Sequence, residues 1–157
     1  MVYAGTFFPE FKEAAGWRKS GISILNREIK KQVYPDGGQY ELDPHYHLAA
    51  INIFCKALRM ADVNGFRQEF PAEYVNTVKS MIEFYANICF PDYSNPCFSD
   101  AKLGDRPAEI RNYQDWLKLF PDCEWIRYYA TEGREGTPLP NLSPVSYTHL
   151  TLPTICS

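Results

Sequence analysis

The spacing of apolar residues constrains the fold of this chain most strongly. Apolar side chains recur at steps of three and four residues through most of residues 1–143, which places them along one face of successive α-helices. No segment of any length alternates apolar and polar residues, as a half-buried β-strand would. We therefore predict an all-α chain of antiparallel helices joined by loops of very unequal length, which suggests that one face carries function.

Cap and proline signals place the helix boundaries. Asp43 followed by Pro44 is the favoured pair for the N-cap and the first helical position, and it predicts a buried helix from Pro44 to about Met60 that is apolar nearly all round. Ser20 predicts the N-cap of an earlier helix that continues to Val33. Further helices are predicted from about Pro71 to Tyr85, from about Pro107 to Phe120, and around Trp125 to Ala130.

Composition narrows the classes of function. Aromatic residues make up 15% of the chain, so they either line a groove for flat ligands such as sugars or serve as ordinary core residues. The formal net charge of −3, with both signs interspersed, does not indicate a nucleic-acid partner. No apolar run approaches the roughly 20 residues that span a bilayer, and the opening MVYAGTFFPEF does not read as a secretory leader. We expect no nucleic acid and no membrane as partners, and either a cytoplasmic protein or a chain whose true N-terminus is missing.

Residues 144–157 differ in character from the rest of the chain. The stretch PVSYTHLTLPT within them has no charged residue and continues no helical pattern. Its back-translation resembles the transposase-end adapter used to make sequencing libraries. We therefore interpret residues 144–157 as a disordered, adapter-derived tail and residues 1–143 as a partial domain. Deletion of the tail should change the free energy of unfolding by no more than about 0.5 kcal/mol.

The cysteines and histidines do not form a recognisable metal site. The cysteines of residues 1–143 are Cys55, Cys89, Cys97 and Cys123. They lack zinc-type spacing and are interpreted as reduced, structural thiols, with pairing of the last two left open. His45 and His47 stand two residues apart in a predicted helix, so their side chains point about 200° away from each other and are poorly placed to share a metal ion. No metal and no cofactor is expected.

The stretch PDGGQYELDPHYH, residues 35–47, combines carboxylates, tyrosines and histidines at a predicted helix start. Unpaired backbone N–H groups and the positive end of the helix dipole favour an anion there. Tyr46 is therefore a candidate base whose phenolate forms more easily than usual, suited to removing a proton next to a substrate carboxylate. Two other interpretations stay open: Tyr46 as a packed aromatic, and Glu41 with Asp43 as a glycosidase carboxylate pair, although Asp43 is better explained as the N-cap.

Two longer stretches carry a family resemblance. They are GISILNREIKKQVYPDGGQYELDPHYHLAAINIFCKA and EFPAEYVNTVKSMIEFYANICFPDYSNPCFSDA. They resemble the heparinase III (heparan-sulfate lyase) family of the heparinase II/III-like polysaccharide lyases, and the likeness runs from about Ala4 to Ser143. The resemblance implies an internal fragment of a longer enzyme. Its fold would be part of an incomplete (α/α) toroid of antiparallel helical hairpins, with the β-sandwich domain of the family absent.

The resemblance also assigns site residues. The Pro-x-Tyr-His motif of the family places the catalytic acid/base at Tyr46, and the following His47 is expected to shape or contact the uronate subsite. Gln39 and Glu41 match the motif more weakly and would line the groove as substrate-binding residues. His45 stands where the family usually has an apolar residue. The family's catalytic Asn and the histidine of its sandwich domain lie outside the matching residues, so we expect the chain to be inactive alone.

The implied reaction is β-elimination at a uronic acid of heparan sulfate or a related acidic glycosaminoglycan. The resemblance also implies a periplasmic or secreted parent protein. Two alternative functions are kept: an (α/α)-toroid glycoside hydrolase, which would need two facing carboxylates, and a non-catalytic helical sugar-binding or scaffold fragment. Four cations either attract substrate sulfates or form a solvated helix face, and they are Arg18, Arg27, Lys30 and Lys31.

Overall fold

The computed structural model describes residues 1–140, and within them the chain forms helices and no strand. The prediction of an all-α chain is therefore confirmed. The helices are α1 (Val2–Phe7), α2 (Ala14–Gln32), α3 (Pro44–Val63), the 3-10 helix η1 (Arg67–Glu69), α4 (Ala72–Ile88), α5 (Arg106–Leu119) and α6 (Glu124–Ala130). The interpretation of residues 144–157 as an adapter-derived tail lies outside the described residues.

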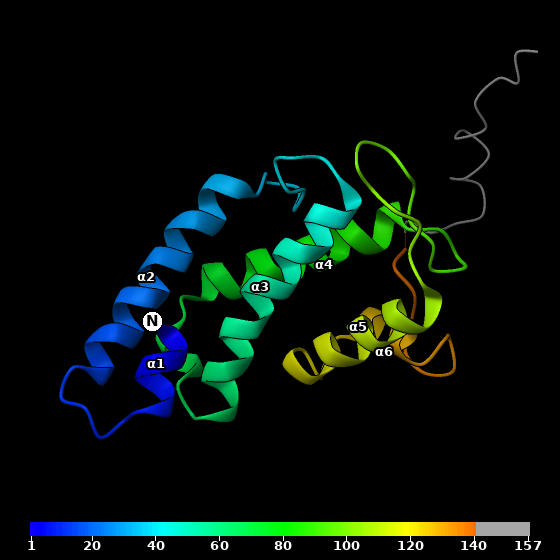
Figure 1. Ribbon diagram of the computed structural model, residues 1–157. Helices are drawn as coiled ribbons and strands as arrows, with labels where there is room; N and C mark the ends of the chain where they lie inside the picture. The colour runs from blue at the N-terminus through cyan, green and yellow to red at the C-terminus, as the bar shows by residue number, and fades with distance from the viewer. Residues whose placement is uncertain (141–157) are drawn as a thin grey trace, which may run out of the picture. The chain divides into compact units, whose positions relative to one another are not determined.

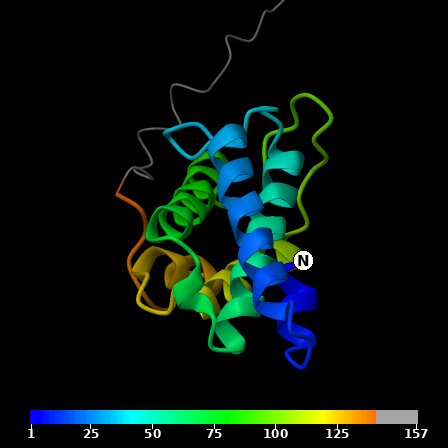
Figure 2. The same ribbon diagram turned by 90° about the vertical axis from the view of Figure 1, so that its left-hand side faces the viewer.

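Two compact units make up the described chain, one of Met1–Arg106 and one that begins at Pro107. In the first unit, α1 packs on both α2 and α3, and α3 packs on α4 and η1. Figure 1 shows this arrangement, with the short α1 between α2 and α3. Figure 2 shows that α4 also runs beside α2. The first unit is thus a cluster of helices with α3 at its centre.

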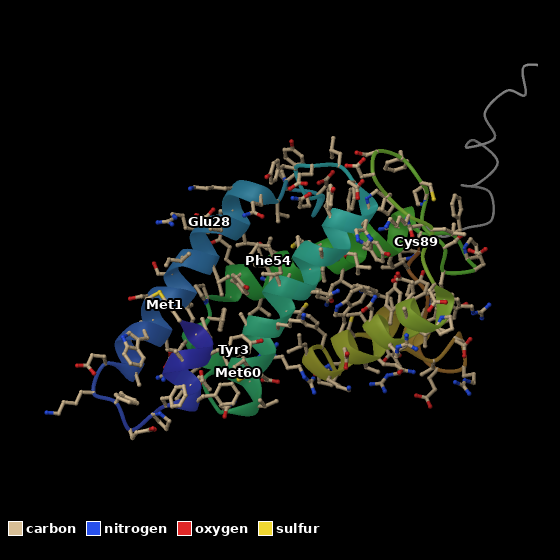
Figure 3. All side chains as sticks on the ribbon, viewed as in Figure 1. Met1, Tyr3, Glu28, Phe54, Met60 and Cys89 are labelled. Atoms are coloured by element: carbon tan, nitrogen blue, oxygen red, sulfur yellow. The ribbon has the colours of Figure 1, made fainter. Side chains whose placement is uncertain are left out.

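The core of the first unit lies between α3 and α4. Ile51 of α3 and Val78 and Ile82 of α4 have no exposed surface, as their helical spacing predicts. Tyr74 is equally buried, and its hydroxyl donates a hydrogen bond of 3.1 Å to the carbonyl oxygen of Phe54, which Figure 3 labels on α3. Each fully buried aliphatic side chain stabilises the fold by about 1.5–3 kcal/mol. These contacts hold the middle of α3 against α4.

Most predicted helix boundaries agree with the structure. Helix α3 begins at Pro44 after the N-cap Asp43 and ends at Val63, slightly beyond the predicted end. Helices α5 and α6 begin and end within one residue of their predicted positions. Helix α4 begins at Ala72, so Pro71 occupies the N-cap position instead of the first helical position.

The predicted start of α2 is wrong. The helix begins at Ala14, and Ser20 lies inside it; the N-cap residue Glu13 makes no side-chain cap hydrogen bond. Tertiary contacts explain the longer helix, because its first turns pack on α1. Gly5 of α1 comes so close that an added Cβ would lie 2.3 Å from the Ala14 carbonyl oxygen. Helix α1 was not predicted, since six residues are too few to show a helical period.

A buried ion pair joins α1, α2 and η1, and we call it the Arg18 clamp. Arg18 donates to both carboxylate oxygens of Glu69, at 2.8 Å and 2.7 Å, and to the carbonyl oxygen of Gly5 at 2.9 Å. Its guanidinium also lies 3.7 Å from the centroid of the Phe66 ring. Arg18 is only 7% exposed, so it belongs to the packed interior and not to a solvated helix face.

The second unit contains α5 and α6, with Tyr113 and Trp116 of α5 both buried. Their rings meet edge to face with centroids 4.9 Å apart, and Tyr113 also contacts Tyr129 of α6 at 5.0 Å. Aromatic pairs of this geometry add to the stabilisation from burial. Across residues 1–140, none of the helices combines the length and the apolar character that a membrane span requires.

Candidate active site

Residues 34–43 form a loop that leads into α3 and rests on α4. The loop closes on itself through hydrogen bonds from the Tyr34 N–H to the Gly38 carbonyl (2.8 Å) and from the Gly37 N–H to the Tyr34 carbonyl (2.9 Å). Gly37 has a φ of +93°, and an added Cβ would lie 2.3 Å from the carbonyl oxygen of Ser80 in α4. Only glycine combines that φ with such a close approach. The loop is therefore seated directly on the backbone of α4.

Asp43 connects the start of α3 to a distant loop. One carboxylate oxygen, Oδ1, accepts the backbone N–H groups of His45 (2.8 Å) and Tyr46 (2.9 Å), which confirms Asp43 as the N-cap. The other oxygen, Oδ2, accepts the N–H of Asp100 at 2.9 Å. Burial raises the pKa of the Asp43 carboxyl, but the three N–H donors outweigh burial, and the net pKa lies below its ordinary value of 3.8.

Tyr46 lies in the first turn of α3 and is 40% exposed. Its hydroxyl donates a hydrogen bond of 3.3 Å to Oδ2 of Asp100. The charge of Asp100 raises the pKa of Tyr46 above its ordinary value of 10.0, and the hydrogen bond, partial burial and the charges of Asp43 and Glu41 act in the same direction. The expectation of an easily formed phenolate is therefore wrong for the resting site. Asp43 already occupies the first N–H groups of the helix, and the hydroxyl lies among carboxylates.

His47 is buried beneath the site, with only 2% of its surface exposed. Its Nδ1 accepts the N–H of Gln39 at 3.1 Å, and its Nε2 lies 2.9 Å from the carbonyl oxygen of Met81, to which it donates. These bonds require the neutral tautomer with hydrogen on Nε2. Burial lowers the pKa of His47 below its ordinary value of 6.5. Both ring nitrogens of His47 are hydrogen-bonded, so His47 connects the 34–43 loop to α4. It also forms part of the wall of the pocket described below.

Gln39 and Glu41, the two weaker predictions for substrate-binding residues, are hydrogen-bonded to each other. Gln39 is 3% exposed, and its side-chain oxygen accepts the N–H of Glu41 at 3.0 Å, while its amide nitrogen lies 3.4 Å from Oε1 of Glu41. Glu41 itself is exposed at the surface of the loop. Of these two residues, Glu41 presents a charged group to solvent, and Gln39 supports it.

A pocket of about 200 Å³ opens beside the start of α3. Its lining is mainly apolar, and comprises Gln39, Leu42, Asp43, Pro44, His47, Phe84, Ile88 and Phe98. Its walls therefore come from the 34–43 loop, from α3 and α4, and from the segment around Phe98. A mainly apolar hollow with a few polar groups is the usual form of a small-molecule site.

Three further predictions concern His45, a metal site and the cysteines. His45 is exposed, with its ring centroid 6.3 Å from that of Tyr46. Among residues 1–140, no group of three or more His, Cys, Asp or Glu side chains is placed to hold a metal ion. Cys97 and Cys123 are free thiols, so they form no disulfide.

The exposed cations of α2 are paired with carboxylates. Lys30 bonds Glu73 at 2.6 Å, while Arg27 and Lys31 both contact Glu28, at 3.0 Å and 3.4 Å. The side chains of these three cations are between 48% and 63% exposed, so the solvated-face interpretation fits them better than a dedicated sulfate site.

Asp100 is the site residue that sequence reasoning missed. It lies 54 positions from Tyr46, in a polar loop whose sequence gives no periodicity and no motif that would direct it to α3. Only the fold brings the two together. The assembled site offers an exposed phenol, fixed by backbone and side-chain bonds and kept protonated at rest, next to a mainly apolar pocket. A positioned phenol beside a pocket is an arrangement that suits proton transfer to or from a bound ligand.

Comparisons with known proteins agree on one family. The model of the family described as Heparinase II/III N-terminus matches residues 1–128. A heparin-sulfate lyase of Bacteroides stercoris is 68% identical over 136 residues, which are 87% of this chain and 20% of that protein. A heparin-sulfate lyase of Pedobacter heparinus is 47% identical over 135 residues, again 20% of its length.

Solved structures give the same result for the fold. The structure of the heparinase III-BT4657 gene product matches with a TM-score of 0.86 and 68% identity, over 88% of this chain and 22% of that chain. The heparan sulfate lyase HepC of Pedobacter heparinus matches with a TM-score of 0.85 and 45% identity, over the same shares. This chain therefore spans about a fifth of the length of the relatives that it matches.

Proposed function

The chain belongs to the heparinase II/III family, whose N-terminal model covers residues 1–128, and we propose that it forms part of a polysaccharide lyase. The substrate is heparan sulfate or a related acidic glycosaminoglycan, which is cleaved at a uronic acid by β-elimination. The names of the similar proteins, heparin-sulfate lyase and heparan sulfate lyase, support this substrate class.

Tyr46 is proposed to transfer the proton in this reaction. A base removes the proton from C5 of the uronate, the electron pair forms the C4=C5 double bond, and the C4–O bond breaks with its pair on the leaving oxygen. The Tyr46 phenolate can take the C5 proton and deliver it to that oxygen, so the elimination consumes no net proton. Since the resting phenol is held protonated beside Asp100, it must lose that proton before it acts as the base.

One observation supports this assignment above the others. Tyr46 is 40% exposed, and both its backbone N–H and its hydroxyl are hydrogen-bonded, so a reactive group is presented to solvent with its two ends held by neighbouring residues. A packed aromatic residue would need no such support. Pre-organisation of this kind is what proton transfer at a sugar ring requires.

The glycosidase alternative finds less support. A glycosidase needs two carboxyl groups that face one substrate. Asp43 is 1% exposed and both its oxygens accept backbone N–H groups, so Glu41 has no free carboxylate partner in Asp43.

The test uses a chimera in which residues of this chain replace the matching segment of the Bacteroides stercoris relative. Tyr46→Phe removes only the hydroxyl, and turnover of heparan sulfate, followed by absorbance of the unsaturated uronate, should fall at least about 100-fold. Tyr40→Phe is the matched control, because Tyr40 is also exposed and lies in the 34–43 loop that leads into α3; its turnover should stay unchanged. Near-normal turnover of Tyr46→Phe would refute the assignment, and absence of the unsaturated product in the parent chimera would refute the lyase function.

The 157-residue chain alone is proposed to be inactive. The charged side chains that act on Tyr46 are carboxylates, and β-elimination also needs a group that neutralises the uronate carboxylate. Incubation of the purified chain with heparan sulfate should therefore give no unsaturated product above background. We further propose that the helices belong to an incomplete (α/α) toroid and that the parent enzyme is periplasmic or secreted.

A further inference from the structure

Three hydrogen bonds close a ring around Tyr46. The Tyr46 N–H donates to Oδ1 of Asp43, the Asp100 N–H donates to Oδ2 of Asp43, and the Tyr46 hydroxyl donates to Oδ2 of Asp100. The ring joins residues 57 and 54 positions apart in the chain. Both ends of Tyr46 are thereby linked to one distant turn.

The turn that carries Asp100 is short and tightly wound. The Ala101 N–H donates to the carbonyl of Phe98 at 3.2 Å, and Ser99 adopts a φ of +59°, in the left-handed region that non-glycine residues seldom occupy. Phe98 at the start of the turn also lines the pocket beside α3. The same turn therefore contributes one wall of the pocket and the carboxylate that holds Tyr46.

The charged and titratable groups around the phenol come from three segments. Asp100 approaches from the 98–101 turn, Asp43 from the helix cap, and Glu41 from the 34–43 loop. His45, the neighbouring residue of α3, contacts the Tyr46 ring edge to face. Of these groups, Asp100 alone is hydrogen-bonded to the hydroxyl.

We propose that Asp100 is the positioning residue of Tyr46. Its carboxylate accepts the hydrogen bond of the hydroxyl and so orients it, while Asp43 holds the 98–101 turn against α3. The effect on turnover rests on the proposed function, because Asp100 must release the hydroxyl before Tyr46 can act as a base. The structural part of the inference does not depend on turnover.

Titration of Tyr46 in the 157-residue chain tests the inference. With tyrosine labelled by ¹³C at Cζ, the Tyr46 resonance is assigned by its loss in Tyr46→Phe, and its midpoint is followed by NMR. In Asp100→Asn, which keeps the shape but removes the charge, the midpoint should move to lower pH. Asp100→Glu, which keeps the charge, should leave the midpoint close to that of the parent chain. Asp92→Asn is the matched control, since Asp92 lies in the same long loop but bonds Ser94, and it should cause no shift.

Amide hydrogen exchange tests the role of Asp43 separately. Asp43→Ser keeps one oxygen for the helix cap but leaves no acceptor for the Asp100 N–H. Exchange of the Asp100 amide should accelerate about tenfold or more, while the amide of Tyr46 stays protected. An unchanged Asp100 amide would show that Asp43 does not hold the turn.

The outcomes separate the inference from the proposed function. An unshifted Tyr46 midpoint in Asp100→Asn overturns the inference, whether or not Tyr46→Phe abolishes turnover in the chimera. A shifted midpoint with normal turnover of Tyr46→Phe supports the inference about Asp100 and refutes the role of Tyr46 in the reaction. If Asp100→Asn loses its helical circular dichroism, Asp100→Ser replaces it with a smaller neutral side chain and the same criterion applies.

Discussion

The first unit carries two polar networks, one at the start of α3 and one at the Arg18 clamp. The clamp fixes the packing of helices, whereas the network at α3 supports an exposed side chain. Each joins residues that are about 50 positions apart or more. In the clamp the bond to Gly5 is buried, the two bonds to Glu69 are part-buried, and Arg18 itself is almost fully buried. At the start of α3 the bonds support an exposed tyrosine. The comparison shows that similar hydrogen-bond chemistry either fixes packing or presents a side chain, according to which partner reaches solvent.

Loss of Arg18 should give the largest effect on stability. Arg18→Met removes the guanidinium and leaves the Glu69 carboxylate, whose side chain is 20% exposed, without its partner. Breaking a buried pair in this way costs about 3–5 kcal/mol. We expect a loss of about 4 kcal/mol in urea unfolding, and no change in the Tyr46 titration if the two networks are independent. A shift of that titration would show that the networks are coupled.

Gly37→Ala should give the next largest loss of stability, and it changes the 34–43 loop that leads into α3. The added Cβ meets the Ser80 carbonyl at 2.3 Å and forces a non-glycine residue to a φ of +93°. Strain of this kind costs about 1–3 kcal/mol before any clash, so we expect a loss of about 3 kcal/mol. Gly65→Ala is the matched control: its φ is +75°, but an added Cβ meets nothing within 4 Å. Equal losses in the two variants would mean that backbone strain alone, without the contact to α4, decides the effect.

His47→Leu should destabilise the chain by about 2 kcal/mol at pH 7.5, because it leaves the Gln39 N–H and the Met81 carbonyl unpaired. The loss should shrink at lower pH. Folded His47 is neutral and its pKa is lowered, so below about 6.5 the unfolded chain binds the proton and the parent chain loses stability as pH falls. Urea unfolding at pH 7.5 and pH 5.5 measures both effects. His45→Gln, at an exposed position of the same helical turn, is the control and should change the free energy of unfolding at pH 7.5 by less than about 0.5 kcal/mol.

Removal of an exposed ion pair should have the smallest effect. Lys30→Gln breaks the bond to Glu73, but the two side chains are 48% and 66% exposed. Such pairs contribute about 0.2–1 kcal/mol, and we expect about 0.3 kcal/mol in urea unfolding. A loss comparable to that of Arg18→Met would contradict the view that burial distinguishes the clamp from the surface pairs of α2.

The sequence predicted those parts of the fold that depend on local signals. The Asp43-Pro44 pair located the start of α3, because the cap bonds involve residues only two and three positions away. The helical spacing of residues 71–85 likewise predicts an inner stripe of Tyr74, Val75, Val78, Met81, Ile82 and Tyr85, and all of these except the half-buried Val75 are buried. In both cases the physical cause lies within one or two helical turns.

Features that depend on distant contacts could not be predicted in this way. Ser20 was a plausible cap, but packing on α1 extends α2 back to Ala14. Tyr46 was placed correctly in the first turn of α3, whereas the direction of its pKa shift depends on Asp100 in a remote turn. No spacing rule connects such residues, because the fold alone decides which loop reaches the helix start.

The different burial of His45 and His47, on either side of Tyr46, makes it possible to measure how often the 34–43 loop opens. His45 is exposed, whereas His47 has both ring nitrogens hydrogen-bonded beneath the 34–43 loop. A reagent that acylates imidazole, such as diethyl pyrocarbonate, should modify His45 at once and reach His47 only when the loop lifts from α4. The ratio of the two modification rates, read by mass spectrometry, would therefore report how often this loop opens while the helices remain folded.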